Sequence, residues 1–171
     1  MACPGYSHHA PCCAFIALGS NLDDPAAQVL RAFDELARLP SSRLLIHSSL
    51  YRSAPVGRLD QPDFINAVAQ IETSLAPHDL LEALLEIERC HGRVREYVNA
   101  PRTLDLDLLM YDDLQCEDRC LILPHPRMHQ RAFVLQPLLE IAPGSHIPGH
   151  GAVTGLLAAC AGQRLEREQH K

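Results

Sequence analysis

The sequence predicts strand, helix, strand, strand, helix, strand in that order, which indicates an α+β fold of the ferredoxin-like (split βαβ) type. Two stretches carry apolar residues at helical spacing, and in a third stretch apolar and polar residues alternate strictly up to a turn. Clusters of Pro, Gly and Asp separate these elements. We expect an antiparallel-containing sheet with helices on both faces and extra C-terminal helices. A flexible tail over residues 1–13 is expected to precede a single domain over residues 14–171.

The first predicted strand is the apolar run 14–18, which Gly19, Ser20 and Asn21 end. An all-apolar run of this length is typical of a central strand buried on both faces. Asp24 and Pro25 then supply an N-cap and a first-turn proline, so a helix is expected from there to about residue 39.

Residues 44–52 predict a second strand, and the Pro- and Gly-containing segment 53–62 predicts a long surface loop. A third strand begins near residue 63 and places Phe64 and Asn66 on one face. These two side chains would suit a flat heteroaromatic ligand, because its ring could stack on Phe64 and the Asn66 amide could form hydrogen bonds with it. The alternative is a purely structural, hydrogen-bonded Asn.

The second half of the chain begins with a helix that Pro77 opens and Gly92 ends. A polar loop leads from there to an alternating strand within residues 101–111. A short strand at 120–123 and two helices at 131–141 and 152–161 complete the expected elements.

The strand within 101–111 carries two carboxylates on one face. Leu104, Leu106 and Leu108 alternate with Asp105 and Asp107, so the two acids lie about 6–7 Å apart along the strand at ~3.3 Å per residue. Two buried like charges require a cation between them. Candidates are an arginine or Mg²⁺, which prefers carboxylate oxygens and usually accompanies a phosphate substrate. The alternative is an edge strand with a solvated acidic face.

Arginines cluster on both sides of this strand. They are Arg89, Arg93, Arg95 and Arg102 before or at its start and Arg119, Arg127 and Arg131 after it. Arginine recognises phosphate through paired hydrogen bonds, so the cluster predicts a local anion site beside the carboxylates.

Composition excludes several classes of function. A net charge of -6 disfavours a nucleic-acid partner, and 5% aromatic residues without Trp disfavour a stacking platform for single strands. No apolar run approaches the ~20 residues of a membrane span, and the N-terminus lacks the pattern of a secretory signal. We therefore expect a cytoplasmic protein with no membrane partner and with reduced cysteines, Cys116 and Cys120 among them. His8, His9, Cys12 and Cys13 do not match zinc-ligand spacing.

Six sequence blocks together resemble one enzyme family. They are 17–22 (ALGSNL), 49–57 (SLYRSAPVG), 61–67 (QPDFINA), 92–95 (GRVR), 101–107 (PRTLDLD), and 123–128 (LPHPRM) with 131–135 (RAFVL). In this order they resemble 6-hydroxymethyl-7,8-dihydropterin pyrophosphokinase of folate biosynthesis, over about residues 14 to 145. PRTLDLD is the most specific block.

The resemblance implies an enzyme that transfers pyrophosphate from ATP to the hydroxymethyl group of the pterin and releases AMP. It implies two Mg²⁺ ions on Asp105 and Asp107, with Arg93 and Arg102 joining these acids as catalytic residues. The ATP contacts implied are Glu88, Arg93, Arg95, Arg102, Leu121, Ile122, His125 and Arg131. The pterin contacts implied are Ser53, Ala54, Pro55, Val56, Phe64, Asn66 and Phe133, with the ring between the two Phe side chains. We expect a monomer whose partners are these small molecules.

Two other functions remain compatible with the residues alone. The same topology serves RNA recognition, although the charge and the lack of a paired aromatic motif oppose it. A non-catalytic nucleotide or pterin sensor on the same scaffold is the second, since a fold does not fix chemistry.

Overall fold

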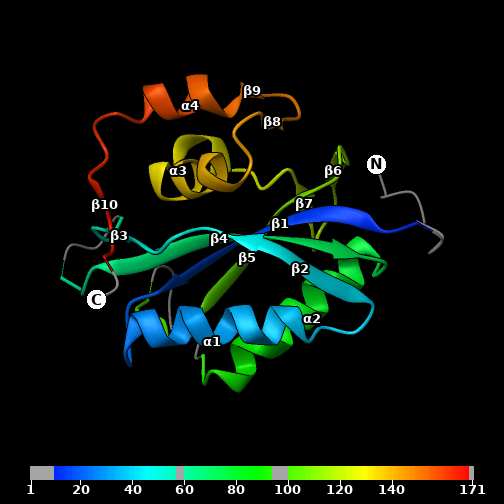
Figure 1. Ribbon diagram of the computed structural model, residues 1–171, viewed down its shortest axis with the longest axis horizontal. Coiled ribbons are helices and arrows are strands. Elements are labelled where there is room, and N and C mark those ends of the chain that lie inside the picture. Colours follow the sequence, from blue (N-terminus) through cyan, green and yellow to red (C-terminus); the bar gives the residue numbers. More distant parts are fainter. Residues whose placement is uncertain (1–9, 57–59, 94–99, 170–171) are drawn as a thin grey trace.

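The computed structural model of the protein describes residues 10–56, 60–93 and 100–169 (Figure 1). The strands are β1 (Cys12–Ser20), β2 (Ser42–His47), β3 (Tyr51–Ser53), β4 (Phe64–Thr73), β5 (Asp105–Tyr111), β6 (Cys116–Glu117), β7 (Ile122–Leu123), β8 (His146–Ile147), β9 (Gly151–Ala152) and β10 (Leu165–Arg167). The helices are α1 (Pro25–Ala37), α2 (Pro77–Cys90), α3 (Ala132–Ile141) and α4 (Val153–Ala159), with a 3₁₀ turn at Met128–Gln130. The structure is therefore α+β.

The main sheet has the strand order β10-β3-β4-β1-β5, with β2 also paired to β4. Every neighbouring pair is antiparallel. The connection from β1 through α1 to β2 skips over β4, and that from β4 through α2 to β5 skips over β1. β1 is thus flanked on both sides, as its apolar sequence predicts.

Helices cover both faces of this sheet. In Figure 1, α1 and α2 lie below it, and α3 and α4 lie above it. The lower core contains Ile16, Leu36 and Leu84, and the upper core contains Val68 and Leu135; each of these side chains is fully buried. Both cores form because β1, β4 and β5 carry apolar residues on both faces of the sheet.

α1 begins where its sequence predicts. The Asp24 side chain accepts a hydrogen bond of 3.4 Å from the backbone N–H of Ala27, and Pro25 occupies the first turn. Leucines at helical spacing, Leu80 and Leu84 among them, bury one side of α2, and its C-terminal end brings Glu88 under β5.

β5 carries the alternation that the sequence predicts. Leu104, Leu106 and Leu108 are at most 4% exposed and face the lower core. Asp105 and Asp107 stand opposite Gly19 and Ala17 of β1 and project from the other side. A bulge opposite Phe15 and Ile16 then leaves Leu109 without a direct partner, and both Leu109 and Met110 join the upper core.

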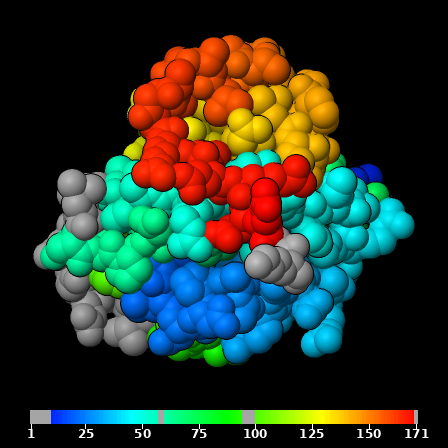
Figure 2. All heavy atoms as spheres, turned by 60° about the vertical axis from the view of Figure 1, so that its left-hand side comes forward, coloured from blue at the N-terminus to red at the C-terminus, as the bar shows by residue number. Residues whose placement is uncertain are grey.

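The predicted strand 44–52 is divided into β2 and β3. Three residues, 48–50, stand opposite only two residues of β4, and the Ser48 Oγ accepts a 3.0 Å hydrogen bond from the backbone N–H of Val68. The Ser48 backbone N–H still donates to the Val68 carbonyl at 2.9 Å, so the side-chain oxygen replaces only the backbone acceptor of this pair, which apolar patterning does not reveal. β10, which pairs with β3, was also not predicted. Figure 2 shows this C-terminal segment, in red, lying across the surface beneath the α3–α4 layer.

Two further expectations need correction. Cys116 is disulfide-bonded, so its prediction as a free thiol is wrong, whereas Cys12, Cys13, Cys90, Cys120 and Cys160 are free. The first strand begins at Cys12, earlier than the predicted residue 14, because Cys12 and Cys13 pair with the end of β4. None of the helices in the described segments combines the length and apolar character needed to cross a bilayer.

Candidate active site

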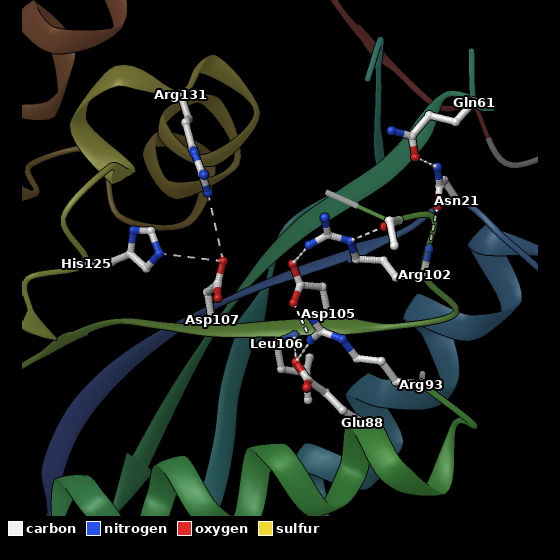
Figure 3. A network of polar contacts seen from close by, with 11 residues as sticks. Asn21, Gln61, Glu88, Arg93, Arg102, Asp105, Leu106, Asp107, His125 and Arg131 are labelled. Carbon is white, nitrogen blue, oxygen red and sulfur yellow. Dashed lines mark hydrogen bonds and ion pairs between the residues drawn. The ribbon is translucent and has the colours of Figure 1, made fainter. Parts of the chain in front are cut away.

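A cavity of about 620 Å³ opens at the edge of the sheet beside β5. Strands β1, β4 and β5 contribute to its lining, together with α2, α3 and the loops that follow β3, α2 and β7. Both aspartates of β5 line it, and Figure 3 shows them on the strand between α3 above and α2 below. This cavity therefore gathers the conspicuous polar residues of the sequence.

Asp105 is held by two arginines. The Nη1 of Arg93 donates to its Oδ1 at 2.5 Å, and the Nη1 of Arg102 donates to its Oδ2. Burial alone would raise the pKa of Asp105, but the charges of Arg102 and Arg93 outweigh burial and hold this pKa below its ordinary value. Asp105 is therefore a fixed negative charge.

Asp107 has a different environment on the same strand face. Its Oδ2 lies 3.7 Å from His125 Nε2 and 3.9 Å from Arg131 Nη1, both longer than a hydrogen bond (Figure 3). Burial and the nearby charge of Asp105 raise the pKa of Asp107 to about 7. Asp107 is thus a carboxylate that lacks an adequate counter-charge in the described structure.

Basic side chains gather on the α3 side of Asp107. Arg131 directly precedes α3, and Arg127 and His125 lie in the preceding turn; all three line the cavity. Burial, then the charges of Arg131 and Arg127, lower the pKa of His125 to about 4, so its ring is neutral at pH 7. Burial and Arg127 also lower the pKa of Arg131. This part of the cavity has an excess of positive charge, which suits an anion.

Glu88 joins α2 to β5. Its side chain is 3% exposed and accepts a 2.8 Å hydrogen bond from the backbone N–H of Leu106, between the two aspartates. The same oxygen also receives the Nη1 of Arg93. Arg93 is thereby held between Glu88 and Asp105, and its position in the cavity is fixed by two carboxylates.

Asn21 fastens two loops of the cavity to each other. Its backbone N–H donates to the carbonyl of Arg102 at 3.1 Å, and its Oδ1 accepts from the Arg102 N–H at 2.8 Å. Its Nδ2 donates to the Gln61 Oε1 at 2.9 Å and to the Pro62 carbonyl at 3.2 Å. Asn21 is 2% exposed, so these bonds form away from water.

Two aromatic rings line the cavity, and each lies beside an arginine. The Arg102 Cζ is 5.6 Å from the ring centre of Phe64 on β4, and the Arg131 Cζ is 5.5 Å from that of Phe133 on α3. Both distances permit cation–π attraction. Asn66, also in the lining, donates to the Ser53 Oγ at 2.9 Å. A flat ring can therefore meet aromatic faces and a polar edge in one place.

The carboxylates fit a hard divalent cation. No group of three or more His, Cys, Asp or Glu with metal-holding geometry occurs within the described residues. Mg²⁺ nevertheless requires only one or two protein carboxylates when phosphate oxygens and water supply its other ligands. The poorly compensated charge of Asp107 and the adjacent Asp105 are such carboxylates.

Comparison with known proteins identifies the family. Residues 15–143 match the family model described as 7,8-dihydro-6-hydroxymethylpterin-pyrophosphokinase (HPPK). A 2-amino-4-hydroxy-6-hydroxymethyldihydropteridine pyrophosphokinase of Pseudomonas aeruginosa is 47% identical over 90% of this chain and 94% of its own. The Haemophilus influenzae protein of the same name is 43% identical over 89% and 95%, respectively. The chain belongs to the HPPK family.

A solved HPPK relative has the same fold at low sequence identity. The structure of Plasmodium falciparum HPPK-DHPS with pteroate superposes with a TM-score of 0.70 at 14% identity. The match covers 90% of this chain but 43% of the Plasmodium chain, so this chain spans less than half of that protein. The likeness supports the α+β architecture of the HPPK domain.

Most of the predicted site residues of this HPPK family member converge. The cavity is lined by Ser53, Ala54, Val56, Phe64, Asn66, Glu88, Arg93, Arg102, Asp105, Asp107, His125, Arg131 and Phe133. Pro55, Leu121 and Ile122 are not among its lining residues: Pro55 and Leu121 are buried, and Ile122 is 42% exposed. Arg95 lies outside the described residues.

Sequence reasoning did not assign several lining residues to the site. Arg127 was recognised in the arginine cluster but given no role, and Gln61, Leu81 and Leu85 were not assigned at all. The position of Arg127, two residues after His125 and four before Arg131, was the available signal for it. Asn21 gave no comparable signal, because its partners Gln61 and Arg102 are 40 and 81 residues away in sequence.

Proposed function

We propose that the protein is a pyrophosphokinase that uses ATP and 6-hydroxymethyl-7,8-dihydropterin in folate biosynthesis. In this reaction the hydroxymethyl oxygen of the pterin bonds to the β-phosphorus of ATP. The bond from that phosphorus to the oxygen bridging the α-phosphate breaks, AMP leaves with the bridging oxygen, and the hydroxyl proton passes to solvent. The products are AMP and the pterin diphosphate. Membership of the HPPK family supports this function.

One observation carries the chemistry. Asp105 and Asp107 project from one strand face into a cavity that Arg93, Arg102, Arg127 and Arg131 also line. Carboxylates beside several guanidinium groups suit a substrate that brings both phosphates and metal ions. This arrangement favours phosphoryl-group transfer over binding of an uncharged ligand.

We propose that Asp105 and Asp107 hold two Mg²⁺ ions, which supply positive charge to the attacking and leaving oxygens when bound. Arg102 and Arg93 bind the triphosphate from one side, while Arg131 and the neutral His125 bind it from the other. Glu88 positions Arg93 and the strand segment between the aspartates. These residues act by orientation and by stabilising charge, and no protein nucleophile takes part.

The acceptor site is proposed between Phe64 and Phe133, with Asn66 and the Ser53–Val56 segment along the ring edge. Both rings line the cavity and lie on different elements, β4 and α3. The pterin is flat and rich in hydrogen-bonding groups, so stacking fixes its plane and the polar edge fixes its orientation. The Leu121–Leu123 segment is retained as a proposed contact for the nucleotide base, in line with the family resemblance.

We assign the finer fold type as ferredoxin-like, with α3, α4 and β10 as additions in one domain. The order β4-β1-β5, with β2 and β3 beyond β4, and the two skipped-strand connections support this assignment. A monomer acting in the cytoplasm, without nucleic-acid or membrane partners, is part of the proposal.

The test is AMP release. Purified protein should form AMP from ATP only when both hydroxymethyl-dihydropterin and Mg²⁺ are present. A folded sample that binds Mg-ATP but releases no AMP with the pterin would reject the enzyme and leave a nucleotide sensor. Release of AMP that is independent of the pterin would reject the acceptor.

A further inference from the structure

Glu140, near the end of α3, uses both carboxylate oxygens to hold a neighbouring segment. Its Oε2 accepts from the phenol of Tyr51 at 2.7 Å, and its Oε1 accepts from the Ser49 hydroxyl at 2.7 Å. The Ser49 backbone N–H donates to the same carboxylate at 3.1 and 3.2 Å, and Arg167 of β10 approaches at 3.3 Å. α3 is therefore fastened to the start of β3.

Tyr51 leads directly to the proposed acceptor site. It is 7% exposed and pairs with Asn66 across the β3–β4 ladder. The Asn66 Nδ2 donates to the Tyr51 carbonyl at 3.3 Å and to the Ser53 Oγ at 2.9 Å. Because Asn66 and Ser53 line the cavity, the segment that Glu140 holds is continuous with one wall of it.

The opposite wall is carried by the same helix as Glu140. Phe133 lies seven residues earlier on α3, which is two turns or about 10.5 Å along the axis and nearly the same side of the helix. Pro137 lies between the two residues and cannot donate the N–H that would bond to the Phe133 carbonyl, but α3 is one helix from Ala132 to Ile141 and carries both side chains. Its buried face already packs on the sheet through Leu135 and Leu138, and the attachment through Glu140 adds a polar contact that ties α3 to the β3–β4 wall carrying Phe64.

We propose that Glu140 is a positioning residue that sets the width of the slot between Phe133 and Phe64, into which the flat acceptor ring binds. The inference rests on the proposed function, because the ring is the acceptor of that reaction. Glu140 itself is not among the residues that line the cavity, so it acts through Tyr51 and α3.

The electrostatics keep this attachment in one form at neutral pH. Burial, then the hydrogen bond and charge of Glu140, raise the pKa of Tyr51 to about 12, so the phenol keeps its proton. Burial opposes ionisation of Glu140, but hydrogen bonds from Ser49 and Tyr51 and the charge of Arg167 together lower its pKa. A protonated donor thus faces an ionised acceptor.

Three variants distinguish a role of Glu140 in positioning the acceptor slot from a contribution to the stability of the fold alone. Glu140→Ala removes the attachment, Glu140→Gln keeps the length and one acceptor oxygen, and Tyr51→Phe removes a single hydroxyl. Glu72→Ala is the matched control, because Glu72 pairs with Arg43 at 3.1 Å near the other end of β4. Binding is measured calorimetrically for 6-hydroxymethylpterin and, separately, for the Mg²⁺ complex of α,β-methylene ATP.

Glu140→Ala should weaken pterin binding at least tenfold and change binding of the ATP analogue by less than twofold. Glu140→Gln should stay within about threefold of wild type for both ligands, and Tyr51→Phe should fall between the two. Should Glu140→Ala not fold, Tyr51→Phe carries the same comparison. Equal weakening of both ligands, or unchanged pterin binding in folded variants, would overturn the positioning role. Failure of the wild type to bind pterin would instead overturn the proposed function.

Discussion

The guanidinium of Arg102 lies over the ring of Phe64, with 5.6 Å between its Cζ and the ring centre. The same guanidinium donates to Asp105, so one side chain links the proposed acceptor wall to the proposed metal site. On the other side of the cavity, Arg131 likewise lies beside Phe133, but its Nη1 is 3.9 Å from the Asp107 Oδ2, too far for a hydrogen bond. In the proposed function, each arginine is therefore placed where the transferred phosphate and the acceptor ring would meet.

Asp107→Asn should lower the rate of AMP release by at least about 100-fold, because the amide cannot supply the anionic oxygen that Mg²⁺ requires. The thermal midpoint of the metal-free variant should equal or exceed that of wild type, since a repelling carboxylate is lost. Asp113→Asn, an exposed change in the turn after β5, is the control and should leave both measurements unchanged. Retained turnover in Asp107→Asn would remove Asp107 from the metal site.

Metal-free wild type should lose stability as pH rises from about 4 to 7. The folded protein keeps a proton on Asp107 up to about pH 7, whereas an unfolded Asp releases it near pH 4. In this window the folded state binds more protons, so raising the pH favours unfolding. Denaturant titrations in EDTA should show this fall relative to Asp107→Asn, and Mg²⁺ should reduce it. Parallel profiles for the two proteins would contradict the raised pKa.

Arg102→Lys should reduce kcat by roughly 10²–10³-fold. This is the loss expected when one hydrogen-bond donor to the charge that develops in the transition state is removed. Lysine keeps the charge but not the planar fork that can reach Asp105, a phosphate oxygen and the Phe64 ring together. Steady-state AMP release measures the effect. Arg43→Lys, on the exposed strand β2, is the matched control. A kcat within threefold of wild type would show that charge alone suffices at position 102.

Arg127→Ala should weaken binding of Mg-ATP roughly tenfold while leaving AMP binding unchanged. Arg127 lines the cavity next to Arg131 and His125, and no ion pair or side-chain hydrogen bond holds its guanidinium in the described part of the chain. It can therefore turn toward the phosphates that AMP lacks. Calorimetry with both nucleotides tests this, and Arg119→Ala serves as an exposed control outside the cavity lining. Equal losses for ATP and AMP would contradict contact with the transferred phosphates.

Strand β5 was the most predictable part of the molecule. Alternation of Leu104, Leu106 and Leu108 with two aspartates fixes which side each residue takes, and the structure has that arrangement. The placement of Phe64 and Asn66 on the same face of β4 was equally predictable, because side chains two residues apart on a strand point to the same side.

The parts that could not be predicted depend on contacts between distant residues. Asn21 pairs with Arg102, and β5 starts three residues later at Asp105 rather than at the beginning of the PRTLDLD block. The Ser48 Oγ takes the place of a backbone carbonyl as the acceptor for the Val68 N–H, at the point where one predicted strand is divided into two. The attachment of Tyr51 to Glu140 likewise joins residues 89 positions apart. Local pattern carries no information about such pairs.

The bulge at Leu109 divides β5 into two stretches that pair with β1 in different registers. Upstream of it, the register with β1 decides that Asp105 and Asp107 face the cavity, and a slip by one residue would turn both into the lower core. The apolar leucines of that stretch therefore specify the orientation of the acids as strictly as any polar contact does. Downstream of the bulge, the register has already shifted by the extra residue. Insertions after Leu109 should therefore leave the orientation of the aspartates unchanged, whereas insertions before Asp105 should alter it.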